Sequence, residues 1–125
     1  MFELTIESHF SAAHRIRSYP GLCEHLHGHN WKVEVTVTCT GLDELGIAID
    51  FRTLKEKTEG ILSELDHTNI NELPAFESMN PTCENIARYL FYRLSNIINS
   101  DRVRVSRVRV WESPGSSATY YEDEG

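Results

Sequence analysis

The chain has 125 residues, of which 40% are hydrophobic, and a formal net charge of −7 with the histidines neutral. This length predicts a single domain over residues 1–125 with enough chain for a hydrophobic core. The acidic balance and the lack of a basic run argue against a nucleic-acid partner, and no apolar run is long enough to span a membrane. Three cysteines without a disulfide spacing, and a strand pattern directly after Met1 in place of a signal peptide, favour a cytoplasmic protein.

Alternating apolar and polar residues predict two strands in the first third of the chain. The first covers residues 2–13, and the second, rich in Val and Thr, covers residues 31–40. Between them, residues 15–29 are expected to form a loop that turns at Tyr19-Pro20-Gly21.

The middle of the chain predicts two amphipathic helices, each with a good N-cap residue. Asp50 can cap the first helix, and Thr82 can cap the second. The apolar stripe of the first helix comprises Phe51, Leu54, Ile61, Leu62 and Leu65. The inward residues of the second are Ile86, Ala87, Leu90, Leu94, Ile97 and Ile98.

Two further strands are expected at residues 102–112 and 118–121. The valines of the third strand change phase halfway, and a β-bulge near Ser106-Arg107 would bring them back to one face. The order ββααββ therefore predicts an α+β fold, with an antiparallel sheet and two helices on one of its faces.

Three histidines share the phase of the predicted buried faces. His14 continues the apolar series of the first strand, and His27 and His29 extend the second strand backwards. His-x-His on an extended chain points both imidazoles the same way, and Gly28 lets the backbone bend close to an ion. Structural zinc sites close with four protein ligands, so three histidines with no obvious fourth favour a catalytic Zn²⁺ over ordinary loop histidines.

Two other positions have two readings each on pattern alone. Glu112 either shares the inward face of the third strand, where an acid must be paired, or follows a strand that has ended at Trp111. Asp66-His67 closes the first predicted helix. His67 there either faces the helix dipole or, oriented by Asp66, transfers protons and activates a thiol.

Of the three cysteines, Cys23 neighbours the proposed metal site. Cys39 is in phase with the core, and Cys83, in the first turn of the second helix, is expected to pack without reacting. His9 is out of phase and His25 lies in the loop, so neither is expected to be a ligand.

Together these residues resemble the 6-pyruvoyl-tetrahydropterin synthase / 6-carboxy-tetrahydropterin synthase family. The matching pieces run nearly end to end and are Phe10-Ser11-Ala12-Ala13-His14-Arg15, Cys23 with His27-Gly28-His29-Asn30, Ile49-Asp50-Phe51, Leu65-Asp66-His67 with Asn71, Asn80-Pro81-Thr82 with Glu84-Asn85, and Glu112. The resemblance implies the tunnelling fold (T-fold), whose ββααββ subunits assemble into a barrel. It also implies a homohexamer, a dimer of trimers with active sites between subunits.

The resemblance implies a role for each candidate site residue. His14, His27 and His29 resemble the zinc ligands of the family, and Cys23 resembles its general base. Asp66 and His67 resemble the relay that ionises this base, Glu112 resembles the acid that anchors the pterin ring and joins the relay, and Thr82 and Glu84 resemble pterin-pocket residues contributed across an interface.

The gap of three residues between Cys23 and His27 is similar to that of the bacterial 6-carboxy-tetrahydropterin synthases of queuosine biosynthesis. The implied substrate is 7,8-dihydroneopterin triphosphate, and the implied products are 6-carboxy-tetrahydropterin, acetaldehyde and triphosphate. Glu24 departs from this pattern. It resembles a residue of relatives that form 6-hydroxymethyl-dihydropterin for folate. Two readings stay open: the chain has that activity, alone or in addition, or Glu24 is a solvated loop residue. A non-catalytic zinc- or pterin-binding protein is a third reading. The intact Cys23, Asp66-His67 and Glu112 argue against it, because binding alone needs no base.

Overall fold

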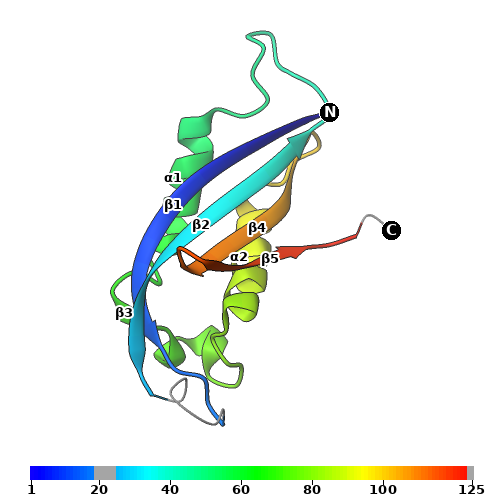
Figure 1. The fold of residues 1–125 in the computed structure, drawn as a ribbon. Coiled ribbons are helices and arrows are strands. Elements are labelled where there is room, and N and C mark those ends of the chain that lie inside the picture. Colours follow the sequence, from blue (N-terminus) through cyan, green and yellow to red (C-terminus); the bar gives the residue numbers. More distant parts are fainter. Residues whose placement is uncertain (19–24, 124–125) are drawn as a thin grey trace.

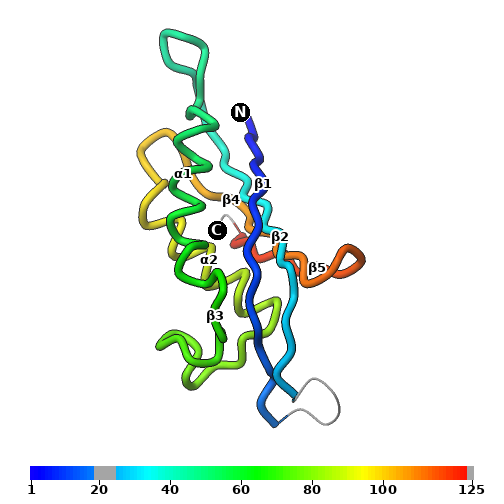
Figure 2. The backbone as a smooth tube through the Cα atoms, turned by 90° about the vertical axis from the view of Figure 1, so that its left-hand side faces the viewer, coloured from blue at the N-terminus to red at the C-terminus, as the bar shows by residue number. Residues whose placement is uncertain are grey.

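A curved sheet with two helices on one of its faces makes up the protein (Figure 1). The structure is a computed structural model and describes residues 1–18 and 25–123. The strands are β1 (Phe2–His14), β2 (His27–Cys39), β3 (Thr68–Asn69), β4 (Val103–Ser113) and β5 (Ser116–Tyr121). The helices are α1 (Phe51–Leu62) and α2 (Cys83–Ile98), with short 3-10 turns at Ile70–Glu72 and Pro74–Phe76. Figure 2 shows α1 and α2 on the same side of the strands.

The strand order in the sheet is β3-β1-β2-β4-β5. The four long strands pair antiparallel, which confirms the expected α+β fold. The short strand β3 was not expected, and it pairs parallel with Ala12 and Ala13 of β1. Two residues are too few to show a strand periodicity, so this element could not be recognised from the sequence pattern.

Strands β1 and β2 pair without a break, from Phe2 opposite Cys39 to His14 opposite His27. The second strand therefore starts earlier than expected, and the predicted loop over residues 15–29 is shorter. This extension matters because it carries the paired ends of both strands to the position of the three histidines.

The predicted β-bulge in the third long strand is present in β4. Thr36 of β2 lies opposite Arg107, but Val37 lies opposite Val105, so Ser106 is the extra residue. Its hydroxyl donates to the Thr36 carbonyl at 3.1 Å. Beyond the bulge, Val108 and Val110 face the core with no exposed surface, and this phase carries Glu112 to the same side.

Both predicted N-caps are confirmed. Asp50 accepts a hydrogen bond from the Arg52 amide at 2.7 Å, and Thr82 accepts one from the Asn85 amide at 3.1 Å. The apolar stripes are narrower than expected, because Phe51 is 57% exposed and Ile97 is 41% exposed.

Helix α1 ends at Leu62, so Asp66-His67 does not close it. The pair lies in the turn that follows, where His67 has a positive φ of 59° and leads into β3. The helix-dipole reading of His67 is therefore wrong, since the dipole acts within the last turn of a helix. In the described part of the chain, no helix has the length and apolar character needed to cross a membrane.

Candidate metal centre

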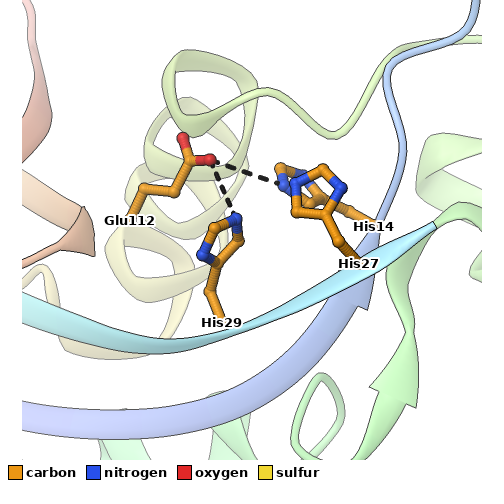
Figure 3. A group of neighbouring side chains, drawn as sticks. All are labelled: His14, His27, His29 and Glu112. Carbon is orange, nitrogen blue, oxygen red and sulfur yellow. Dashed lines mark ion pairs between the residues drawn. The ribbon is translucent and has the colours of Figure 1, made fainter. Parts of the chain in front are cut away.

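The register of β1 and β2 brings the three predicted histidines together. His14 lies directly opposite His27, and His29 follows two residues along β2 on the same face. Figure 3 shows these side chains and Glu112, from the end of β4, pointing toward one another. One nitrogen or oxygen of each residue lies within 4.8 Å of the others, which is a group able to hold a metal ion.

Backbone carbonyls set the protonation of two of the rings. His14 donates from Nδ1 to the Pro81 carbonyl at 2.7 Å, and His27 donates from Nδ1 to the His25 carbonyl at the same distance. A carbonyl can only accept, so each Nδ1 carries the proton and each Nε2 carries a lone pair. This second hydrogen bond is typical of metal-binding histidines, because it orients the ring and raises its basicity.

The Nε2 atoms of His14 and His29 are buried, and neither makes a hydrogen bond of good geometry, although the Glu112 Oε1 lies 3.0 Å from His29 Nε2. Buried polar atoms in native proteins are nearly always satisfied, so two such nitrogens in one cluster are typical of a site that can bind a ligand. Three imidazoles with one carboxylate are a donor set that suits Zn²⁺. The residues present therefore fit the predicted metal.

Burial favours the neutral form of two of these rings. Burial lowers the pKa of His14, opposed in part by its hydrogen bond to Pro81 and by the charge of Glu112. Burial also lowers the pKa of His29, again opposed by Glu112. Neutral imidazole is the form that binds a metal, so the lone pairs are available near neutral pH.

Glu112 points inward, which decides between its two sequence readings. Strand β4 continues to Ser113, and the Glu112 Oε1 lies 3.0 Å from His29 Nε2 and 3.7 Å from His14 Nε2. The side chain is still 34% exposed. The carboxylate can therefore approach a metal held by the histidines or meet a molecule that enters from outside.

A cavity of about 310 Å³ opens beside this group. Its lining residues come from the end of β1 and the chain just after it, from β2, from the start of α2 and from the end of β4. They are His14, Ile16, His27, Thr82, Cys83, Glu84 and Glu112. The predicted pocket residues Thr82 and Glu84 thus lie in the same cavity as the histidines of their own chain, whereas the resemblance implied that they are contributed across an interface. This volume is at the lower end of the range for small-molecule sites.

Cys83 lines the cavity, which the sequence pattern did not indicate. Its thiol donates to the Val110 carbonyl at 3.0 Å, and burial raises its pKa to about 11. It therefore stays a neutral thiol near neutral pH and is unsuited to act as a base. Cys39 is buried as expected.

The predicted roles of Cys23 and Glu24 concern residues outside the described ranges.

Asp66 and His67 form the expected pair at a different place in the fold. The Asp66 Oδ2 lies 2.9 Å from His67 Nδ1, and its Oδ1 accepts from the Ser11 amide at 2.8 Å. The bond from Ser11 lowers the pKa of Asp66, and His67 adds to this effect. His67 is 83% exposed at the edge of the sheet, and among the described residues it has no hydrogen bond or ion pair with the metal-binding group.

The sequence matches known pterin enzymes over nearly its whole length. The family described as 6-pyruvoyl tetrahydropterin synthase matches residues 3–123. The 6-carboxy-5,6,7,8-tetrahydropterin synthase of Bacillus subtilis is 31% identical over 131 residues, covering 99% of this chain and 88% of the relative. The dihydroneopterin monophosphate aldolase of Pyrococcus furiosus is 37% identical over 103 residues, covering 82% of each chain.

The fold also matches that of solved structures. The solved 6-pyruvoyl tetrahydropterin synthase of Caenorhabditis elegans superposes with a TM-score of 0.85 at 28% identity, covering 98% of both chains. The tunnelling-fold architecture of the subunit, implied by the resemblance, is thereby confirmed.

Proposed function

The chain belongs to the 6-pyruvoyl tetrahydropterin synthase family, and from this premise we propose that it is a zinc-dependent 6-carboxy-5,6,7,8-tetrahydropterin synthase. The substrate is 7,8-dihydroneopterin triphosphate, and the products are 6-carboxy-tetrahydropterin, acetaldehyde and triphosphate, within queuosine (7-deazaguanine) biosynthesis. One observation carries the proposal, namely the three histidines that meet Glu112 with two unpaired Nε2 atoms at a cavity. The odd number of cysteines supports a cytoplasmic location for this lyase.

His14, His27 and His29 would hold the metal, with one proton on the Nδ1 of His14 and of His27. Bound there, Zn²⁺ supplies a Lewis acid that polarises a developing carbonyl of the substrate side chain. Glu112 would anchor the pterin, because a carboxylate accepts two parallel hydrogen bonds from the ring amino group and the neighbouring N–H. Thr82 and Glu84 line the cavity beside it.

Cys23 would remove the side-chain proton as a thiolate, which is the reactive form of cysteine. Asp66 would orient His67 so that His67 stabilises this thiolate. His67 is largely exposed at the sheet edge, where a neighbouring subunit can reach it, and this supports an active site that lies between subunits.

A homohexamer would cover surface that a single chain leaves open. In the described residues, β3 covers only Ala12 and Ala13 of the outer edge of β1. Open strand edges promote association unless they are paired or blocked. A mostly apolar cavity of about 430 Å³ also lies at the start of β1 and is lined partly by Phe2, Ile47 and Phe51, each of which is exposed.

A folate-branch reaction is the second candidate. The Pyrococcus furiosus relative is named as an aldolase, and Glu24 directly follows Cys23 in this chain. Glu24 would then act as a base at a different substrate atom and lead to 6-hydroxymethyl-dihydropterin, alone or beside the carboxy product. A non-catalytic zinc- or pterin-binding protein is the third candidate.

Product analysis separates these candidates. The zinc-loaded protein is incubated with 7,8-dihydroneopterin triphosphate, and the products are identified by mass spectrometry. We expect 6-carboxy-tetrahydropterin and acetaldehyde from the unchanged chain, and neither from Cys23→Ala, with a rate loss on the order of 10²–10⁴. A hydroxymethyl product that disappears in Glu24→Ala would establish the folate activity. No turnover by the unchanged chain would contradict the proposal that the protein is an enzyme.

The metal has its own test. His27→Ala should lose both zinc and turnover, whereas His9→Ala should keep both, because His9 is exposed on β1 and lies outside the metal-binding group. Metal analysis of the purified proteins measures the zinc content. Full zinc occupancy in His27→Ala would contradict the ligand assignment.

A further inference from the structure

Two asparagine side chains hold the segment of chain that leaves His14. Asn71 accepts from the Arg15 amide at 2.8 Å and donates to the Arg15 carbonyl at 3.0 Å. Asn80 does the same to Arg17, accepting at 2.9 Å and donating at 3.2 Å. Each side-chain amide thus pairs with one backbone residue as a neighbouring strand would.

Asn80 differs from Asn71 because it directly precedes Pro81, the residue whose carbonyl receives the Nδ1 proton of His14. The carbonyl of Asn80 in turn accepts from the Asn85 side chain at 2.9 Å. Pro81 is therefore held on both sides in the chain, by Asn80 before it and by the Thr82 cap of α2 after it.

The Arg17 side chain closes the same structure. Its guanidinium donates to the carbonyls of Phe76 at 2.7 Å, Asn71 at 3.1 Å and Met79 at 3.3 Å. These bonds tie the segment before Asn80 to the chain that follows His14. The guanidinium uses three hydrogen bonds to backbone carbonyls to hold this segment, out of the five N–H donors that an arginine side chain has.

These contacts form a closed circuit that starts and ends at His14. The chain runs from His14 to Arg17, crosses to Asn80 through the paired amide, continues to Pro81 and returns through the bond to His14 Nδ1. His14 is 2% exposed, and its Nε2 is one of the two unpaired atoms that face the metal position. Moving the Pro81 carbonyl would free the imidazole of His14 to change tautomer or rotate.

We infer that Asn80, supported by Arg17 and Asn85, is a positioning residue for the metal site: it holds the Pro81 carbonyl where it fixes the His14 ring with Nε2 toward the metal. The inference rests on the metal site of the proposed function and is independent of which pterin product is formed. Loss of a ligand's direct outer partner costs about 10- to 100-fold in metal affinity, and Asn80 acts through that partner, the Pro81 carbonyl, so this range is the upper limit for its loss.

The experiment compares Asn80→Ala with Asn71→Ala, because each change removes one amide that pairs with the same segment. Zinc affinity is measured by competition with a chromophoric chelator. We expect Asn80→Ala to bind zinc more weakly, by up to about 100-fold, and Asn71→Ala to bind it close to wild type. In the metal-free proteins, long-range ¹H–¹⁵N spectra of the imidazoles should show His14 with its proton on Nδ1 in wild type and Asn71→Ala. Asn80→Ala should show a mixture of tautomers.

Equal weakening by both variants would mean that the asparagines only tether the segment, and unchanged affinity in Asn80→Ala would also overturn the inference. If Asn80→Ala does not fold, Asn85→Ala removes the other support of the same peptide and should weaken zinc in the same direction. A wild-type protein that binds zinc while Asn80→Ala is unchanged refutes the inference alone. A wild-type protein that binds no zinc refutes the metal site of the proposed function.

Discussion

Among single residues, Glu112 is the one whose surroundings allow two roles. Its Oε1 lies close to two histidine nitrogens, as a fourth metal ligand would, yet a third of the side chain is exposed toward the cavity. A ligand and a pterin anchor differ in what their removal costs, because the first holds the metal and the second holds only the organic molecule.

We expect Glu112→Gln to weaken pterin binding while zinc content stays normal. The amide keeps one acceptor and replaces the other with a donor, so a charge-assisted hydrogen bond worth about 1.5–3 kcal/mol is lost. This corresponds to roughly 10- to 150-fold weaker binding of a pterin product, measured by calorimetry. If the variant loses zinc together with the pterin, Glu112 is a metal ligand.

Cys83 supports a prediction about reactivity. With its pKa raised to about 11 by burial, it stays protonated until the solution approaches that pH. Brief treatment of the folded protein with iodoacetamide at pH 8 should leave Cys83 unmodified, whereas denatured protein should be fully alkylated. Mass spectrometry of peptides locates the modified cysteines, and rapid labelling of Cys83 in the folded protein would contradict its assignment as an inert thiol.

Among the elements, the turn after α1 is the one that sequence periodicity describes least well. It is held to β1 by the Ser11 amide, which donates to Asp66, and by the His67 amide, which donates to the Ser11 carbonyl at 2.6 Å. These bonds place β3 beside Ala12 and set the direction of the His67 ring. The turn thus holds Asp66 and His67 in a fixed position relative to β1.

Asp66→Asn should lower the free energy of unfolding near neutral pH. The folded-state pKa of Asp66 lies below its ordinary value of 3.8, so its charge stabilises the fold above that pH. This contribution is lost as the pH falls from about 3.8 through the folded pKa, so wild type and variant should converge there. Urea unfolding of the metal-free proteins from neutral to acid pH measures the difference. Asp101→Asn, at an exposed position, is the control, and a pH-independent gap for Asp66→Asn would refute the account.

At the scale of the whole molecule, the proposed homohexamer would use the open edges of the sheet. Strand β1 is uncovered along most of its outer edge in the described structure, and exposed apolar side chains gather near its start. The helices cover one face of the sheet, so growth of the assembly would proceed along the strand edges and close a barrel.

We expect light scattering to give a mass several times that of one chain, with a hexamer as the proposed state. Phe51→Glu should weaken this assembly, because Phe51 is 57% exposed and lines the apolar cavity at the start of β1. Ile97→Glu is the matched control, since Ile97 is an exposed apolar residue on α2 outside that cavity. A stable monomer that turns over substrate would contradict the barrel.

The local patterns of the chain were sufficient for much of this description. Period-two alternation placed His14, His27 and His29 in one phase, and the structure brings them to one face. The change of phase among the valines located the bulge near Ser106-Arg107, but it left Glu112 with two readings, and the structure decided for the inward one. The caps at Asp50 and Thr82 were also evident. These features follow from sequence because burial on one face imposes a period on neighbouring residues.

Contacts between distant segments were decided by the tertiary structure alone. The Pro81 carbonyl reaches His14 across 67 positions of chain, and a backbone carbonyl has no residue type that a pattern could reveal. The parallel pairing of β3, the burial of Cys83 at the cavity and the exposure of Phe51 likewise depend on how complete elements pack. Sequence determined which side chains could meet, because periodicity is local; packing decided which groups surround them, because the neighbours come from other parts of the chain.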